Sequence, residues 1–380
     1  MTTTAHTATS PLGAHLVGSV PLANADEVIA TAAAQLGDHL RRIPDGETGV
    51  RTIWIVWQEK VFADNPNLEP VASDNEQYAA HTRYRVRDGA TAASVDFGSL
   101  GYADHALESY KRFAALKSRG EIRPDVRFQI SLPTPLAPIN QFAALDQRAA
   151  LEPRYEAAME REIARIADEI PPGEACIQID IAFEMGMAEG INHPLFEAWF
   201  PDAITGAADR IARVSSQVPA HVELGYHLCY GDFGHEHFLQ PADASRLVQM
   251  ANAIAGRVSR QIAFVHLPVP RDRDDAAYMA PLTNLRLHPE TEVYLGLIHL
   301  TDGIAGAQRR IAAAQQALPR FGVAAECGFG RRPAQTVIPL MQIHAAVAQP
   351  IPAVERSADA ANSDDADDPA GIDDRVRDRR

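Results

Sequence analysis

The segment His221-Val-Glu-Leu-Gly-Tyr-His-Leu-Cys-Tyr230 predicts a buried strand that ends in the pair His227-x-Cys229. Side chains two residues apart leave a strand on the same face, about 6–7 Å apart along it. An imidazole and a thiol at this spacing suit a soft divalent metal, most often zinc. A third soft ligand, Cys327, stands much later in the chain, in Ala325-Glu-Cys-Gly-Phe-Gly330. We expect the elements between them to bring these two segments together.

A simpler interpretation exists for each of these residue types. A single His-x-Cys pair occurs by chance in many proteins, and a free cysteine is usually a small buried hydrophobic residue. Cys176, early in another predicted strand, is interpreted in that way. His235 and His237 form a second pair, but their polar, glycine-containing segment favours a solvated loop. The metal hypothesis therefore depends on the surrounding sequence.

Composition limits the classes of protein to consider. The chain has 380 residues, of which 46% are hydrophobic, enough for one large core or two modest domains. Its formal net charge of -15 argues against nucleic acids and anionic membrane surfaces as partners. Three cysteines in a chain of this length do not make a disulfide framework. We therefore expect a reducing, cytoplasmic environment.

The two ends of the chain differ from its middle. Residues 1–13 are predicted to be flexible, and the first ten lack the basic start and apolar core of a secretory signal. We find no apolar run long enough to span a bilayer. Residues 351–380 alternate pairs of aspartate with arginine and carry few aliphatic side chains, which predicts a disordered acidic tail.

Eight short apolar segments recur along the chain, and predicted helices separate most of them. Continuous apolar runs are typical of parallel strands covered on their outer face. Eight such units favour an α/β fold, a single (β/α)8 TIM barrel over residues 14–350; no glycine-rich phosphate fingerprint follows the first strand. The predicted strands are residues 14–20, a short segment leading into 41–49, 127–133, 175–181, 221–230, 261–267, 292–300 and 322–327. The predicted helices are residues 24–37, 152–169, 194–218, 241–256, 303–318 and 333–349, and 51–123 is mixed helix and loop.

Polar side chains gather where these strands end, which is where the active site of such a barrel lies. Ionisable groups are rarely buried without a partner. Some have structural interpretations as well: Ser19 and Asp45 fit turns, and Asp180 fits a helix N-cap. His266 is equally interpreted as a hydrogen-bonded core histidine. The polar residues at the strand ends are Ser19, Asp45, Glu47, Asp180, Glu184, His227, Cys229, His266, Asp302 and Cys327.

Five short motifs occur in order along the chain: Val17-Gly-Ser-Val-Pro21, Asp45-Gly-Glu47, Ile177-Gln-Ile-Asp180, His227-Leu-Cys-Tyr230 and Glu326-Cys-Gly-Phe-Gly-Arg331. In the same order they resemble segments of the C-terminal catalytic barrel of cobalamin-independent methionine synthase, namely Ile-Gly-Ser-Phe-Pro, His-Gly-Glu, Ile-Gln-x-Asp, His-Met-Cys-Tyr and Asp-Cys-Gly-Leu. That barrel belongs to a superfamily that also holds uroporphyrinogen decarboxylase. The similarity covers residues 14–349, the whole predicted barrel.

The resemblance implies transfer of a methyl or other alkyl group to a zinc-bound thiolate. It implies that His227, Cys229 and Cys327 are zinc ligands. Such chemistry has a clear physical basis, because a free thiol has a pKa of about 8.5 and is a poor nucleophile while protonated. Zinc deprotonates a coordinated thiol and presents a thiolate at neutral pH. One coordination position must stay open for the substrate.

The resemblance also assigns the residues that surround the metal. It implies that Ser19, Glu47 and Asp180 hold the amino-acid part of a small thiol substrate. Glu47 and Asp180, together with His266, are the predicted catalytic residues. Carboxylates at this rim suit an ammonium group, because charge-assisted hydrogen bonds are the strong ones.

Three departures from the family pattern bear on this prediction. The family usually carries a glutamate ligand after the next strand; here His266 stands near that position, and Glu223 is the other candidate for a metal ligand. The long synthases have an N-terminal barrel that helps to bind the folate donor, and these 380 residues contain none. The methyl or alkyl donor therefore stays open among a folate, a corrinoid protein and another carrier. Asp45 stands where the family motif has histidine.

Two other functions stay open from the sequence. A metal-free decarboxylase or lyase of the uroporphyrinogen decarboxylase type would direct basic side chains at substrate carboxylates. A non-catalytic barrel that binds a small ligand would tolerate the loss of Cys229 and Cys327. The basic residues available for the decarboxylase are Arg41, Arg42, Arg331 and Arg332.

Overall fold

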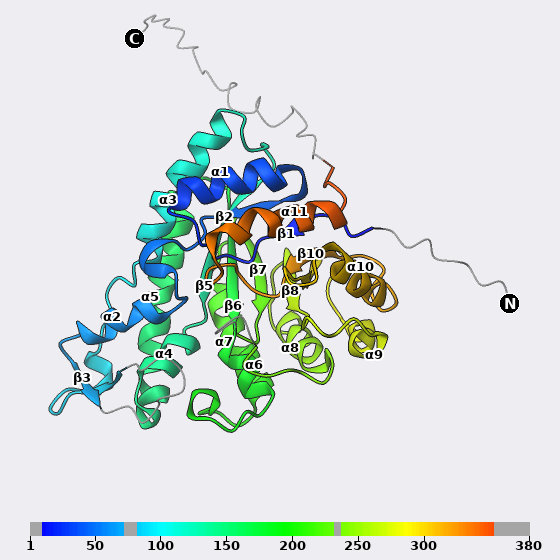
Figure 1. The fold of residues 1–380 in the computed structure, drawn as a ribbon. Coiled ribbons are helices and arrows are strands. Elements are labelled where there is room, and N and C mark those ends of the chain that lie inside the picture. The colour runs from blue at the N-terminus through cyan, green and yellow to red at the C-terminus, as the bar shows by residue number, and fades with distance from the viewer. Residues whose placement is uncertain (1–9, 72–81, 232–236, 353–380) are drawn as a thin grey trace, which may run out of the picture.

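A computed structural model describes residues 10–71, 82–231 and 237–352 of the chain. Its main sheet has eight parallel strands in the order β1-β10-β9-β8-β7-β6-β5-β2. Parallel bridges from Ala14 to Leu40 and from Ser19 to Gly46 join the first strand segment to the second and complete the ring. The prediction of a (β/α)8 barrel is confirmed (Figure 1). The predicted flexible residues 1–9 and tail residues 353–380 lie outside the described residues.

The barrel strands are short and fall within the predicted apolar segments. Most residues of these strands are buried, as in β6, where all seven are. The strands are β1 (Ala14–His15), β2 (Arg42–Pro44), β5 (Arg127–Pro133), β6 (Ala175–Ile181), β7 (Glu223–Leu228), β8 (Phe264–Pro268), β9 (Glu292–Ile298) and β10 (Gly322–Ala325).

Helices surround the sheet and pack on one another in sequence around it (Figure 1). The first follows the predicted boundaries, because Asn24 accepts a hydrogen bond from the Glu27 backbone N–H and caps it. The helices are α1 (Ala25–Leu36), α2 (Glu59–Ala63), α3 (Tyr102–Ser118), α4 (Leu136–Phe142), α5 (Arg148–Glu169), α6 (Phe183–Ala188), α7 (Ala203–Ser216), α8 (Ser245–Ala255), α9 (Ala276–Met279), α10 (Gly303–Ala314) and α11 (Val337–Val347). Among the described residues, no helix combines the length and the hydropathy needed to cross a membrane.

The long stretch 51–123 carries structure that the sequence did not resolve. It contains an antiparallel hairpin of β3 (Leu68–Val71) and β4 (Arg83–Val86), in addition to α2 and α3. Strands of four residues leave too few positions for the period of two to be recognised in the sequence. The predicted helix 194–218 is also shorter, because a 3-10 turn and a loop precede α7.

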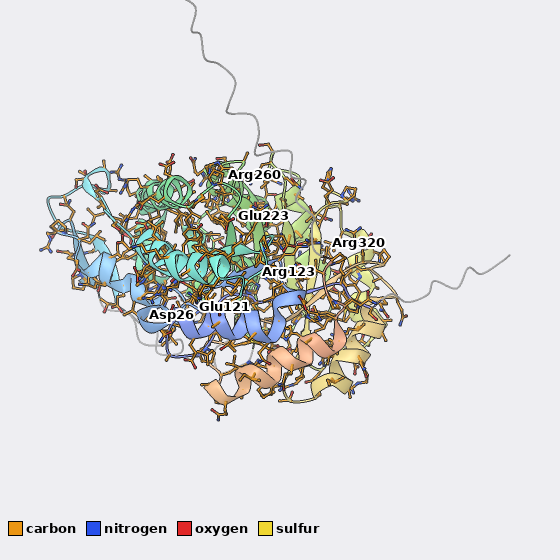
Figure 2. The ribbon with its side chains drawn as sticks, turned by 90° about the horizontal axis from the view of Figure 1, so that it is seen from above. Asp26, Glu121, Arg123, Glu223, Arg260 and Arg320 are labelled. Atoms are coloured by element: carbon orange, nitrogen blue, oxygen red, sulfur yellow. The ribbon has the colours of Figure 1, made fainter. Side chains whose placement is uncertain are left out.

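The amino-terminal ends of the strands are closed by a cluster of ion pairs. Arg42 is 4% exposed and donates to Glu223 at 2.7 Å and to Glu292 at 2.8 Å. Arg127 adds a second contact to Glu223 at 2.8 Å. Figure 2 looks at the molecule from above and labels Glu223 and Arg260 on this side. This end of the barrel is therefore filled, and the opposite end is left for a site.

Candidate metal centre and pocket

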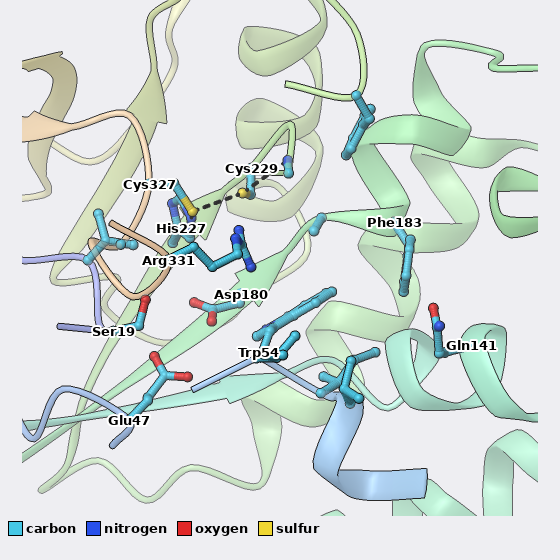
Figure 3. Close-up of a pocket in the computed structure, with 18 of the residues that line it drawn as sticks. Ser19, Glu47, Trp54, Gln141, Asp180, Phe183, His227, Cys229, Cys327 and Arg331 are labelled. Atoms are coloured by element: carbon cyan, nitrogen blue, oxygen red, sulfur yellow. Dashed lines mark hydrogen bonds between the residues drawn. The ribbon is translucent and has the colours of Figure 1, made fainter. Parts of the chain in front are cut away.

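The strand ends bring the three predicted soft ligands together. His227 is on β7, Cys229 directly follows it, and Cys327 follows β10. Their ligand atoms all lie within 4.8 Å of one another. The Cys229 and Cys327 sulfur atoms are 3.6 Å apart, and Cys327 Sγ is 3.7 Å from His227 Nε2. Figure 3 shows the two sulfur atoms facing each other beside the imidazole.

These separations fit tetrahedral zinc. Zn–S bonds of about 2.3 Å and Zn–N bonds of about 2.0–2.1 Å at tetrahedral angles place two sulfur atoms about 3.8 Å apart and a sulfur and a nitrogen about 3.6 Å apart. The observed 3.6 Å and 3.7 Å agree with both values. The backbone N–H of Gly231 also donates to Cys229 Sγ at 3.3 Å, a contact that stabilises a thiolate. The donor set and its spacing therefore suit zinc.

His266 supports the cluster from behind. Its Nε2 lies 3.0 Å from the carbonyl oxygen of Ala325, and its Nδ1 lies 2.7 Å from His227 Nδ1. A carbonyl only accepts, so His266 Nε2 carries the hydrogen. Burial lowers the pKa of His266 to about 3, so the ring is neutral and its Nδ1 accepts from His227. This fixes His227 with a proton on Nδ1 and a lone pair on Nε2, the nitrogen that faces the sulfur atoms.

The structure gives other partners to both candidates for a further ligand, His266 and Glu223. The two ring nitrogens of His266 are turned to His227 and Ala325, so His266 buttresses a ligand and does not occupy a ligand position itself. Glu223 stands at the start of β7, at the opposite end of the strand from His227, where Arg42 and Arg127 hold its carboxylate. Strand direction alone separates it from the cluster.

A pocket of about 1100 Å³, including the part open to solvent, adjoins the ligand cluster. Its polar side is formed by Ser19, Glu47, Asp180 and Arg331. Ser19 Oγ accepts from the Gly330 backbone N–H at 3.2 Å, which ties the segment after β10 to the end of the first strand segment. The residues predicted to hold substrate therefore border the same pocket as the predicted metal ligands (Figure 3).

The two pocket carboxyl groups, Glu47 and Asp180, both have raised pKa values. Burial, followed by the neighbouring Asp45, raises the pKa of Glu47 to about 7, against the effect of Arg51. Burial and the charge of Glu47 raise the pKa of Asp180 well above its usual range. Gln178 donates to Asp180 at 2.8 Å. The pair therefore keeps a proton near neutral pH and gains charge stabilisation when a cation enters.

Asp45 supports the Glu47 loop from outside the pocket lining. Burial raises the pKa of Asp45, but the ion pair with Arg51 at 2.6 Å outweighs it and the pKa is lowered. Ser109 also donates a hydrogen bond to Asp45 at 2.7 Å. Among the described residues, Glu47 and Trp54 are the non-glycine residues with left-handed backbone, at φ of 49° and 27°. Both border the pocket, which is consistent with the concentration of backbone strain at functional sites.

The sequence prediction missed an apolar wall of the pocket. We define the aromatic wall as Trp54, Phe183, Phe196 and Phe238, all of which line the pocket. Their rings touch in series, with centroids 5.5 Å apart for Trp54 and Phe183, 5.9 Å for Phe183 and Phe196 and 4.8 Å for Phe196 and Phe238. These residues come from three separate segments without a periodic pattern. The aromatic content of the unassigned stretch 51–123 was the one signal for Trp54.

Two other predicted residues have structural roles. Asp302 accepts from the buried Arg310 at 2.8 Å and lies outside the pocket lining. Glu184 is a fully buried residue of α6 that accepts from Thr134 and also lies outside the lining. Cys176 is fully buried in the barrel core, as predicted.

One member of the predicted His235/His237 pair differs from the prediction. His235 lies outside the described residues, but the side chain of His237 is 2% exposed, so it is not a solvated loop residue. Its Nε2 lies 3.5 Å from Glu326, which also contacts His299 at 3.4 Å and Arg332 at 3.1 Å. Burial raises the pKa of Glu326, but these partners, of which His299 has the largest effect, lower it to about 2.

The arginines available for a decarboxylase are mostly engaged elsewhere. Arg41 and Arg42 pair with Glu292 at the closed end of the barrel. Arg332 pairs with Glu326. Of the four, Arg331 is the one that lines the described pocket.

Comparison with known proteins adds a likeness to a solved structure. No protein-family model matches the chain, and no curated protein matches it. Among solved structures, the chain is similar to a methyltransferase from Methanosarcina mazei, with 12% sequence identity and a TM-score of 0.49. The match covers 88% of this chain and 93% of that one. At this level of similarity the neighbour carries no inference about activity.

Proposed function

We propose that this protein transfers a methyl or other alkyl group to a small thiol that is held as a thiolate at a zinc site formed by His227, Cys229 and Cys327. The observation that carries the proposal is the convergence of these three ligand atoms, with separations of 3.6 Å and 3.7 Å, at the open end of the barrel. Bound zinc would supply one thing, deprotonation of the thiol at neutral pH.

The protein residues supply orientation and charge. His266 fixes the tautomer of His227, so that the unprotonated Nε2 of His227 faces the two cysteines. Glu47 and Asp180 are proposed to bind an ammonium group of the thiol, and Ser19 to accept or donate one further hydrogen bond. Holding the thiol by its polar end would leave its sulfur at the cluster and the aromatic wall to the second substrate.

Metal content tests the proposal. The purified protein is compared with a Cys229→Ser/Cys327→Ser variant by elemental mass spectrometry under reducing conditions. We expect about one zinc per chain in the wild type and none in the double variant. Cys176→Ala is the matched control, since Cys176 is the remaining cysteine of the chain and lies in the core outside the pocket lining. It should keep its zinc.

Thiol binding is the second half of the test. Replacing the metal with cobalt gives a coloured site, and addition of homocysteine should add a sulfur-to-cobalt charge-transfer band. A wild-type protein that stays free of metal after zinc is added back would refute the proposal. If the protein retains zinc but the spectrum of its cobalt-substituted form does not change when thiols are added, the proposed substrate class is refuted.

A further inference from the structure

The pocket has an aromatic wall that the proposed thiol would leave open for a second substrate. Its aromatic wall is continuous, and its acidic side chains lie directly beside that wall. Trp54 connects the two, because its side chain lies beside Asp180 and partly offsets the rise that burial causes in the pKa of that carboxyl, while its ring centroid lies 5.5 Å from that of Phe183. Figure 3 shows Trp54 next to Asp180 with Phe183 beyond it. A ligand in this pocket therefore meets aromatic surface and carboxyl groups together.

The chemistry of these groups selects for positive charge. The faces of aromatic rings carry the negative part of a quadrupole and attract cations, and the attraction increases when the site is desolvated. The carboxyl groups of the lining are Glu47 and Asp180, and its single permanently charged basic residue is Arg331. A cation beside the wall stabilises the ionised form of the Glu47/Asp180 pair, and an uncharged apolar ligand does not.

Size and shape narrow the class of cation. An ordinary ammonium group is strongly hydrated and prefers direct hydrogen bonds to carboxylates. A cation surrounded by methyl groups has no N–H to donate and instead presents apolar surface that carries charge, which matches an aromatic wall. Among the four side chains of the wall, the indole N–H of Trp54 is the one hydrogen-bonding group, and Trp54 lies beside Asp180.

We propose that the aromatic wall binds a small onium compound, a sulfonium or quaternary ammonium cation carrying methyl groups, as the alkyl donor. The role as donor rests on the proposed alkyl transfer to a thiol. The binding itself rests on Trp54, Phe183, Phe196 and Phe238 and on the neighbouring carboxyl pair.

The transfer balances without any further reactant. The thiol has already lost its proton to solvent, and its thiolate sulfur attacks a methyl carbon of the cation. A sulfur–carbon bond forms as the bond from that carbon to the onium atom breaks. The bonding pair stays on the leaving atom, which departs as a neutral thioether or tertiary amine. Loss of the positive charge removes its attraction to the wall and favours product release.

A pair of matched probes tests the binding step in the metal-free protein. Choline and 3,3-dimethylbutan-1-ol have the same shape and differ in the charge of the central atom. Isothermal titration of each is carried out with a metal chelator and a reductant present. We expect choline to bind roughly 10-fold more tightly than the neutral alcohol. Equal affinity would overturn the proposal in favour of an uncharged apolar ligand.

Variants assign the preference to the wall. Trp54→Leu and Phe183→Leu should each reduce the preference for choline to about threefold or less, because leucine retains apolar surface but has no quadrupole. Trp199→Phe is the control, since Trp199 packs on Phe200 and donates to Glu152 outside the pocket lining. It should keep the full preference. Circular dichroism confirms the fold of each variant, and an undiminished preference in both leucine variants would refute the assignment.

The two proposals fail in different ways. A protein that never retains zinc but still prefers choline would refute alkyl transfer, and with it the role of the cation as donor. A zinc-loaded protein that binds thiols but shows no preference for choline would refute the onium inference alone. Transfer of a methyl group from trimethylsulfonium to homocysteine, followed by mass spectrometry, would support both.

Discussion

The hydrogen bond between His227 and His266 gives the sharpest prediction about the metal centre. Replacing His266 with phenylalanine keeps a ring in the barrel and removes the acceptor for His227 Nδ1, a contact of 2.7 Å. His227 is then free to place its proton on either nitrogen, and a protonated Nε2 cannot bind metal. We expect zinc affinity to fall about 10–100-fold, the usual effect of losing such a partner.

That loss corresponds to about 1.4–2.7 kcal/mol of binding free energy. The variant also leaves the carbonyl of Ala325 without its donor, at a cost of about 1–3 kcal/mol in the free energy of unfolding. Competition with a chromophoric chelator measures the first quantity, and urea unfolding measures the second. His266→Gln should recover part of the affinity, because an amide both accepts from His227 and donates to Ala325.

Cobalt spectra separate this role from direct ligation. If His266 only orients His227, the cobalt-loaded His266→Phe protein keeps the wild-type positions of its d–d bands at saturating metal. A shift of those bands to a different coordination geometry would refute the reasoning and restore His266 as a ligand. His344→Phe is the control, because His344 is equally buried but bonds within α11 to Leu340. Its zinc affinity should match the wild type.

Two further predictions concern stability. The pKa of Glu47 is raised from 4.5 to about 7, so the folded state binds more protons than the unfolded state between these values and loses stability as pH rises through them. Urea unfolding should therefore show that the free energy of unfolding is about 1–3 kcal/mol lower at pH 8 than at pH 5 because of Glu47. Glu47→Gln should remove this difference, and an equal pH dependence in the variant would contradict the assignment. Arg42→Met should destabilise the barrel by about 1–3 kcal/mol, because Glu223 and Glu292 lose their most buried partner but keep Arg127 and Arg41. Zinc affinity of the folded Arg42→Met protein should be unchanged, since the ion-pair cluster lies at the other end of the strands, and a loss of metal would show that the two ends are coupled.

Elements that depend on local pattern were predictable from the sequence. The continuous apolar runs and intervening helices predicted a (β/α)8 barrel. A parallel strand that is buried on both faces can be recognised from its own residues, because they form an unbroken apolar run. The alternation along β7 placed His227 and Cys229 on one side of a strand. Short elements escaped prediction, as with β3 and β4, because four residues carry too little periodicity.

What the sequence by itself determined was which residues stand at strand ends and which of them are soft ligands. The tertiary structure decided where each side chain is directed. His266 and His227 are neighbours only because β7 and β8 pair in register, and the carbonyl that orients His266 comes from β10. Glu223 was excluded by the direction of its strand, and the aromatic wall formed from three distant segments. Such contacts depend on the packing of distant chain segments, which no local pattern encodes.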